Sequence, residues 1–233
     1  MKRTTVVAHG GYSTKYPENT FGSYVAAAEA GVDVIEMDIV ISADAEVFCF
    51  HPVSGVDGFD KEIEKTPSAI LRTNGYSSLE KVLKALNKYD SKIYFDLKQD
   101  RLELINKSIE IAKSQGFEES EIVVGSRSED KLKYLKKSYN VIVLGLPQDP
   151  DKYEEFFEMG GDIYRLWEKD LTRGRVEAIH KLDGEVWVTP GHKATKTQPR
   201  TAGQASKQKL EWFIELGVDG VILNDVEAIS QLE

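Results

Sequence analysis

Two pairs of charged residues stand in apolar runs of the sequence, and a single residue separates the members of each pair. Glu36 and Asp38 lie in VDVIEMDIVI, and Asp96 and Lys98 lie in KIYFDLK. Alternate residues of a β-strand point to the same side, so the members of each pair share one face. The spacing therefore predicts that three carboxylates and one ammonium group converge on one site from two strands.

Three carboxylates in one cleft repel one another, and a hard divalent cation is the simplest way to neutralise them. We therefore expect Glu36, Asp38 and Asp96 to bind Mg²⁺ or Ca²⁺. Zinc is disfavoured, because the sequence has no closely spaced cysteine and histidine ligands. His9 ends the run TTVVAH and His51 ends the run EVFCFH. Imidazoles titrate near neutral pH, so both histidines are assigned to proton transfer.

Short β-branched runs recur along the chain and predict nine strands. They span residues 4–9, 32–41, 46–51, 92–98, 121–125, 141–145, 162–167, 185–189 and 220–224. Most are separated by segments of helical periodicity, such as RLELINKSIEIAKSQG, which is typical of a parallel sheet covered by helices. The even spacing, without a linker, predicts an α/β fold in which residues 1–233 form one (β/α)₈ TIM-barrel domain. The reactive residues of such a barrel stand at the carboxyl ends of its strands.

Nine strands exceed the eight places of this barrel. The link between Asp38 and His51 is too short for a helix and SADA predicts a turn, so one of the two runs that it joins is expected to be a hairpin extension or an irregular barrel strand. A turn near Asp44 would place Asp38 roughly opposite His51. Residues 52–76 have no clear period and are interpreted as a short insertion after the third strand. Residues 190–204 form a second long, polar and basic loop, of a length that is usually functional or mobile.

The composition limits the partners of the protein. With 233 residues, of which 41% are hydrophobic, the chain can bury a sizeable core. Its net charge of −9 would repel the backbone of a nucleic acid or an anionic membrane. No apolar run reaches the roughly 18 residues that a membrane helix needs, and no signal-peptide core precedes His9. We expect a cytoplasmic protein without stable membrane insertion and with no nucleic-acid partner. The oligomeric state stays open.

The strings AHGGYSTKYPENT, GVDVIEMDIVISADAEVFCFH, IYFDLK and GVDGVILND together resemble the glycerophosphodiester phosphodiesterase family of phospholipase C-like barrels. The likeness covers nearly the whole chain in order, and the combined motifs are highly specific. It implies a (β/α)₈ hydrolase that cleaves a small-molecule phosphodiester, in lipid and glycerol metabolism, into an alcohol and glycerol phosphate. The nucleophile is either water or a neighbouring hydroxyl of the substrate itself.

The resemblance also implies roles for the candidate residues. The cation is held by the positions that match Glu36, Asp38 and Asp96. The positions that match His9 and His51 act as acid and base, in an order that the sequence leaves open.

Two further polar residues are assigned to the surroundings of the reacting group. The resemblance implies that Lys98 contacts the phosphate of the substrate. Glu18, nine residues after His9, can hold in place the residues that contact the ligand.

Three positions depart from the family pattern. Gly10 stands where an arginine usually follows the first histidine, Pro52 stands where an aspartate usually follows the second, and residues 188–191 replace a Trp-Thr-Val-Asn end. The arginine normally makes charge-assisted bonds to the phosphate. Its loss could weaken transition-state binding by about 2–4 kcal/mol.

These departures leave two interpretations open. In the first, which we favour because every acid, base and ligand position is filled, the charge has moved to Arg165 or to Lys193, Lys196 or Arg200 of the long loop. In the second, the chain is a catalytically impaired or non-hydrolytic ligand-binding barrel of the same family. A third class, a sugar-phosphate isomerase or aldolase barrel, would need a Schiff-base lysine or a glycine-rich phosphate cup, for which GVDGVILND is a weak candidate.

Each candidate also has a purely structural interpretation. His9 could be a hydrogen-bonded core histidine and Lys98 a surface lysine, but their motifs favour function. Glu18 could equally organise the start of the next helix. Trp167, near the end of its strand, is expected to line the substrate pocket, whereas Trp212, at helical spacing with Leu216, is expected in the core.

Overall fold

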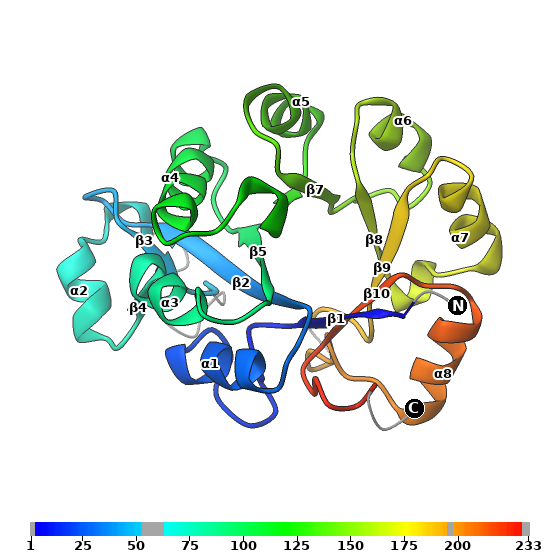
Figure 1. The fold of residues 1–233 in the computed structure, drawn as a ribbon, viewed down its shortest axis with the longest axis horizontal. Coiled ribbons are helices and arrows are strands. Elements are labelled where there is room, and N and C mark those ends of the chain that lie inside the picture. The colour runs from blue at the N-terminus through cyan, green and yellow to red at the C-terminus, as the bar shows by residue number, and fades with distance from the viewer. Residues whose placement is uncertain (1–2, 53–62, 195–197, 230–233) are drawn as a thin grey trace.

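Eight parallel strands close into a ring in the computed structural model, which describes residues 3–52, 63–194 and 198–229 (Figure 1). The ring strands are β1 (Thr5–Ala8), β2 (Val34–Ile41), β5 (Lys92–Leu97), β6 (Ile122–Ser126), β7 (Ile142–Gly145), β8 (Ile163–Trp167), β9 (Glu185–Thr189) and β10 (Gly220–Leu223). Their order is β1-β10-β9-β8-β7-β6-β5-β2, and β1 pairs with β2 to close the ring. The predicted (β/α)₈ barrel is confirmed.

Helices surround the ring and connect its strands (Figure 1). They are α1 (Phe21–Glu29), α3 (Leu79–Leu86), α4 (Leu102–Ser114), α5 (Glu129–Ser138), α6 (Tyr153–Glu158), α7 (Arg173–His180) and α8 (Lys207–Glu215). In α3 the buried residues are Leu79, Val82, Leu83 and Leu86. This spacing places one apolar stripe against the strands, which is why the segment folds as an amphipathic helix.

The strands bury both of their faces, so the barrel has two hydrophobic layers. Ile93 and Phe95 of β5 point outward and pack under the helices, whereas Tyr94 points into the barrel. There it meets Trp187 of β9, with ring centroids 6.4 Å apart. Asp96 lies two residues beyond Tyr94 and shares its inward face. The interior therefore changes from apolar to charged toward the carboxyl ends of the strands.

The hairpin predicted between the second and third runs is confirmed. β3 (Val47–Cys49) pairs antiparallel with β2 outside the ring, and Ile39 lies opposite Cys49. The Phe50 N–H donates to the Asp38 carbonyl, so His51 lies one residue past the position opposite Asp38. A two-residue strand that the sequence did not reveal, β4 (Ser77–Ser78), pairs with β3.

The predicted insertion at 52–76 is described from residue 63 onward. It contains a 3₁₀ turn (Ile63–Lys65) and α2 (Ser68–Thr73). Ile63 and Leu71 pack against Val40 and Phe48, and thus cover the outer side of the β2–β3 hairpin.

The long loop at 190–204 is tied to the barrel on both sides of residues 195–197, which lie outside the described part. The Thr201 N–H donates to the His192 carbonyl and the Gly203 N–H to the Pro190 carbonyl. The Asn224 N–H then donates to the Gly203 carbonyl, just past the end of β10. The loop is thereby fixed beside the carboxyl ends of β9 and β10.

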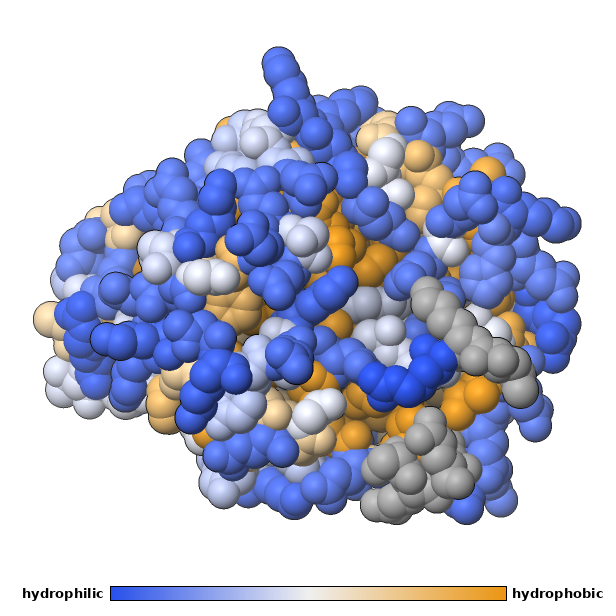
Figure 2. Space-filling model, viewed as in Figure 1, coloured by the Kyte–Doolittle hydropathy of each residue, from blue (hydrophilic) through white to orange (hydrophobic). Residues whose placement is uncertain are grey.

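The surface is mostly polar. Figure 2 shows hydrophilic residues over most of one face, with hydrophobic residues visible in a central hollow. Among the described residues, no helix combines the length and the apolar character needed to cross a bilayer. The cytoplasmic location stays a prediction.

Candidate active site

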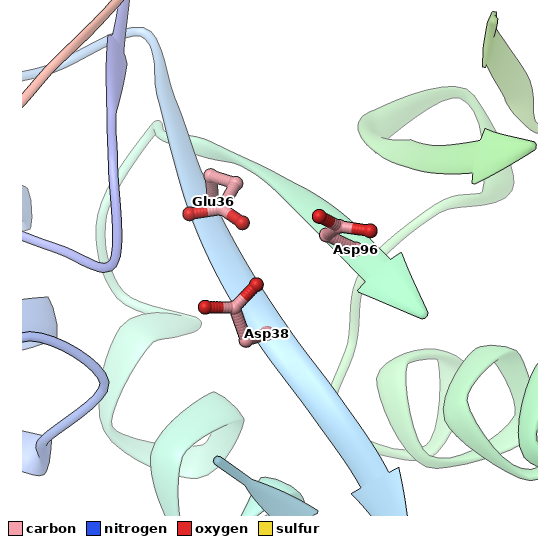
Figure 3. Close-up of side chains that lie close together, drawn as sticks. All are labelled: Glu36, Asp38 and Asp96. Carbon is pink, nitrogen blue, oxygen red and sulfur yellow. The ribbon is translucent and has the colours of Figure 1, made fainter. Parts of the chain in front are cut away.

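Three carboxylates meet inside the barrel at the carboxyl ends of β2 and β5. Glu36 and Asp38 share the inward face of β2, and Asp96 is the parallel-sheet partner of Asp38 on β5. One oxygen from each carboxylate lies within 4.8 Å of the other two. Figure 3 shows the three side chains directed toward a common space. The structure thus brings together the residues predicted as metal ligands.

Two cations partly balance this cluster. Lys98 Nζ lies 2.5 Å from Asp38 Oδ1 and 2.6 Å from Asp96 Oδ2. Arg127, just past β6, places Nη2 2.6 Å from Asp96 Oδ1. Burial, the largest single influence, would raise the pKa of both aspartates, but the positive charges and hydrogen bonds of their neighbours, with Lys98 foremost, together lower both pKa values. Both aspartates are therefore ionised at neutral pH.

Glu36 is not balanced in this way. Its burial, and then the negative charges of Asp38 and Asp96, raise its pKa well above the ordinary value. The surroundings of Glu36 thus disfavour its ionised form, in contrast to the two aspartates. A further cation would stabilise the ionised form of Glu36, and an all-oxygen donor set of three carboxylates suits a hard divalent ion. These residues can hold a divalent cation.

Backbone and amide donors orient two of the carboxylates. The Gly10 N–H donates to Glu36 Oε2 at 2.7 Å. Asn19 Nδ2 donates to Asp38 Oδ2 at 2.8 Å, while Asn19 Oδ1 accepts from the Tyr24 hydroxyl at 2.8 Å. These bonds fix the Glu36 and Asp38 carboxylates in place before any ligand arrives.

His9 is held in a single tautomer. Asn224 Nδ2 donates to the Ala202 carbonyl at 3.0 Å, which turns Asn224 Oδ1 toward His9 Nδ1 at 2.7 Å. An amide oxygen only accepts, so Nδ1 carries the proton and Nε2 is left as an acceptor. Nε2 accepts from Arg200 Nη2 at 2.9 Å. Burial, followed by the positive charge of Arg200, lowers the pKa of His9, which is neutral at pH 7.

His51 lies just past β3 and lines the same pocket. Burial lowers its pKa, although the Asp38 carboxylate opposes that effect. Its Nδ1 is buried and has no hydrogen-bond partner among the described residues. Pro52 follows it directly, and a proline has neither an N–H nor a polar side chain to offer.

The four cations predicted as substitutes for the missing arginine have different places. Arg200 reaches His9, and its Nη1 also lies 2.7 Å from Glu18 Oε1. Glu18 thus pairs with Arg200 and also lines the same cavity. Arg165 and Lys193 lie instead at the ring of Trp167, with their charged groups 4.5 and 5.7 Å from its centroid. Lys196 lies outside the described residues.

Most of the charged groups described above line one cavity of about 660 Å³. Its walls include the acidic cluster, both histidines, Lys98, Arg200, Arg165 and Trp167. Trp167 thus lines the pocket, as expected. The expectation for Trp212 was wrong, because its side chain is 40% exposed and lines a neighbouring groove. α8 buries Leu210 and Phe213, and this leaves Trp212 at the edge of the buried face.

Sequence reasoning missed three residues of the site: Asn19, Arg127 and Asn224. Two of them continue the alternation of their strands by one more step. Arg127 follows inward-facing Val123 at an interval of four residues, and Asn224 follows inward-facing Ile222 at an interval of two. Asn19 adopts φ +59°, a left-handed conformation that asparagine tolerates better than most residues, but its contacts had no sequence pattern of their own.

Comparison with known proteins agrees with this geometry. The profile of the glycerophosphoryl diester phosphodiesterase family matches residues 9–146, more than half of the 233-residue chain. The chain belongs to this family. The resemblance read from the motifs is confirmed, and membership identifies a phosphodiesterase-type enzyme.

Individual relatives match this chain over almost its whole length. A glycerophosphodiester phosphodiesterase of Caldanaerobacter subterraneus subsp. tengcongensis is 25% identical over 99% of this chain and 98% of its own length. The crystal structure of a glycerophosphodiester phosphodiesterase from Parabacteroides distasonis has a TM-score of 0.81 at 20% identity, covering 99% and 97% of the two chains. A phosphodiesterase from Oleispira antarctica, solved with the product sn-glycerol-3-phosphate, has a TM-score of 0.77 at 19% identity, covering 97% and 95%.

The backbone at Gly10 generates a prediction about stability. Its φ is +60°, and a Cβ there would stand 3.0 Å from Glu18 Cβ and 3.3 Å from Asn19 N. We expect Gly10→Ala to lower the free energy of unfolding by about 1–2 kcal/mol, because an L-residue is strained in this conformation. Urea denaturation measures it.

Gly174→Ala is the matched control. Gly174 lies in α7, and nothing stands within 4 Å of an added Cβ. Alanine is the better helix former, so this variant should lose no stability. A Gly10→Ala protein as stable as Gly174→Ala would contradict the proposed strain.

Proposed function

We propose that the chain hydrolyses glycerophosphodiesters to an alcohol and glycerol phosphate, with a divalent cation as cofactor and two histidines as proton-transfer groups. One observation carries the proposal: a single cavity of about 660 Å³ is lined by the acidic cluster, by His9 and His51, and by Arg200. Family membership supports the reaction class. The products would connect the reaction to lipid and glycerol metabolism.

Glu36, Asp38 and Asp96 are proposed to hold Mg²⁺ or Ca²⁺. The donor set of three carboxylate oxygens and the raised pKa of Glu36, which burial and its charged neighbours cause, support this choice. When bound, such a cation supplies Lewis-acid polarisation of a phosphoryl oxygen and favours ionisation of an attacking hydroxyl.

His9 is proposed as the base. Its Nδ1–H is fixed on Asn224 and its Nε2 lone pair faces the cavity, so Nε2 is the atom able to take a proton. That proton comes from the attacking hydroxyl, either of water or of the substrate, as the new P–O bond forms. A bound phosphodiester is a stronger acceptor for the Arg200 guanidinium than an imidazole is, and its arrival frees Nε2.

His51 is proposed as the acid that protonates the leaving alcohol as the second P–O bond breaks. Burial lowers its pKa in the free protein. An anionic phosphodiester beside it, together with Asp38, opposes that effect and favours the imidazolium.

Arg200 and Lys98 are proposed to bind the oxygens of the scissile phosphate, with Glu18 as the group that orients Arg200. The assignment is best supported for Arg200, because its guanidinium contacts His9. In the family pattern an arginine directly follows this histidine. The charge missing at Gly10 is then supplied by the long loop. Arg165 and Trp167 are assigned to the substrate on the opposite side of the cavity.

Lys98 does not fit the Schiff-base lysine that the isomerase or aldolase alternative requires. A Schiff-base lysine needs a lowered pKa. Burial would lower the pKa of Lys98, but the Asp38 and Asp96 carboxylates outweigh it and raise the pKa above its ordinary value.

Turnover of glycerophosphoethanolamine tests the proposal directly. With Mg²⁺ or Ca²⁺ we expect release of ethanolamine and glycerol phosphate, which EDTA abolishes. His9→Ala should lower kcat by at least about 100-fold, the usual range for loss of a general acid or base. His180→Ala removes a histidine that pairs with Asp219 away from the pocket, and should keep its activity. Binding of the diester without turnover would overturn the proposal in favour of a non-hydrolytic barrel.

The pH dependence of Arg200→Met tests the relocated charge. Besides burial, the Arg200 charge holds the pKa of His9 below its ordinary value. Removing that charge raises the pKa, so His9 becomes protonated at a higher pH. The acidic limb of the kcat/KM profile should therefore move to higher pH. The plateau should fall roughly 30- to 900-fold, equivalent to about 2–4 kcal/mol.

Arg173→Met, which removes an exposed arginine of α7, is the control and should leave both features unchanged. If the acidic limb stays in place in Arg200→Met, His9 is not the base that Arg200 controls.

A further inference from the structure

Arg165 is a buried cation for which the proposed reaction has no defined use. It lies on the inward face of β8, and in the eight-strand ring β8 stands four places from β2 in either direction. Its side chain is thus across the barrel from Glu36 and Asp38. Only 7% of the residue is exposed, and Nη1 is buried with no hydrogen-bond partner within the described residues. An unsatisfied buried guanidinium is costly, and a ligand anion would satisfy it.

A second cation, Lys193, lies at the same tryptophan ring as Arg165. The Arg165 guanidinium lies 4.5 Å from the centroid of the Trp167 ring, and Lys193 Nζ lies 5.7 Å from the same centroid. Arg127 adds a third positive charge nearby, but both of its terminal nitrogens already donate, one to the Leu97 carbonyl and one to Asp96. Arg165 and Lys193 are therefore the groups with capacity to bind an anion.

The neighbouring carboxylates are already engaged. Glu168 accepts from the Gly191 N–H at 2.7 Å and pairs with Lys209 Nζ at 2.6 Å. Asp170 pairs with Lys169 at 3.0 Å. Asp96 is held by Lys98 and Arg127. Asp96 and Asp170 still attract Arg165 through space, but within the described residues no hydrogen bond or ion pair joins any of these carboxylates to Arg165 or Lys193.

The cavity continues past this point. A groove of about 1240 Å³ adjoins the active-site cavity, and the two share Arg127, Leu146, Arg165, Trp167 and Lys193 as walls. A ligand with its phosphate at His9 and Arg200 can therefore extend between Arg165 and Lys193 toward the groove. Arg165, Trp167 and Lys193 also lie beyond residue 146, where the match to the family profile ends.

We propose that the preferred substrates are glycerophosphodiesters whose leaving alcohol carries an anionic group of its own, which binds Arg165 and Lys193 at Trp167. The inference rests on the proposed function and specifies its substrate class. The glycerol half of the substrate has only hydroxyl groups and does not call for two positive charges. A carboxylate or a phosphomonoester on the alcohol does.

Two matched pairs of substrates test this selectivity. Glycerophosphoserine differs from glycerophosphoethanolamine by one carboxylate, and a glycerophosphoinositol phosphate differs from glycerophosphoinositol by one phosphomonoester. We expect kcat/KM to favour the anionic member of at least one pair by tenfold or more. The pair that shows the preference identifies the anionic group. Equal kcat/KM within both pairs would overturn the proposal.

Variants then assign the preference to residues. Arg165→Met keeps an unbranched side chain over Trp167 and should reduce the preference at least tenfold. Lys193→Met changes an exposed loop residue, does not threaten folding, and should reduce the same ratio. Lys152→Met removes an exposed lysine on another segment and should leave the ratio unchanged. If Arg165→Met lowers kcat/KM equally for both members of each pair, Arg165 holds the scissile phosphate and the proposal is wrong.

Binding separates this inference from the proposed function. If no diester is hydrolysed, the proposed function fails, yet calorimetry on the intact protein still compares the Kd values within each pair. Tighter binding of the anionic member, lost in Lys193→Met, would support the anion subsite alone. Equal Kd values would reject it.

Discussion

Mutual repulsion among three buried carboxylates governs the structure of this barrel's carboxyl end. Glu36, Asp38 and Asp96 are placed within 4.8 Å of one another by adjacent parallel strands. Lys98 and Arg127 form ion pairs with the aspartates, and the Gly10 N–H donates a hydrogen bond to Glu36. Burial, followed by the negative charges of the two aspartates, still raises the pKa of Glu36. A divalent cation would stabilise the ionised form of Glu36, and the proposed chemistry depends on such a cation.

The long loop after β9 completes the site from the other side. Its Ala202 carbonyl sets the orientation of Asn224, which fixes the tautomer of His9, and its Arg200 approaches His9 Nε2. The loop thus controls both the protonation and the charge environment of one histidine. In the proposed function, this loop supplies the positive charge that the family pattern places on the residue after His9. The backbone N–H of Gly10 donates to Glu36.

The fold and the acidic cluster could be predicted because both follow from alternation within strands. Glu36 and Asp38 share the inward face with Val34, and Asp96 shares it with Tyr94. The hairpin of β3 was predictable because the twelve residues between Asp38 and His51 leave no room for a helix.

The remaining site residues depend on contacts that have no period. Arg127 and Asn224 directly follow β6 and β10 and continue the inward alternation, but alternation alone does not show that Arg127 pairs with Asp96 or that Asn224 contacts His9. Nothing in the loop sequence ranks Arg200 above Lys193, because the choice depends on how the loop is tied to Asn224. Trp212 shows the opposite error, since spacing by one helical turn from Leu216 does not by itself say which side of α8 is buried.

Calorimetric titration of Mg²⁺ and Ca²⁺ into the metal-free protein measures the central claim most directly. The account predicts one cation bound per chain, with affinity reduced at least tenfold in Asp96→Asn and unchanged in Glu103→Gln, which removes an exposed carboxylate of α4. Absence of saturable binding, or equal binding by wild type and Asp96→Asn, would show that the three carboxylates do not form a cation site.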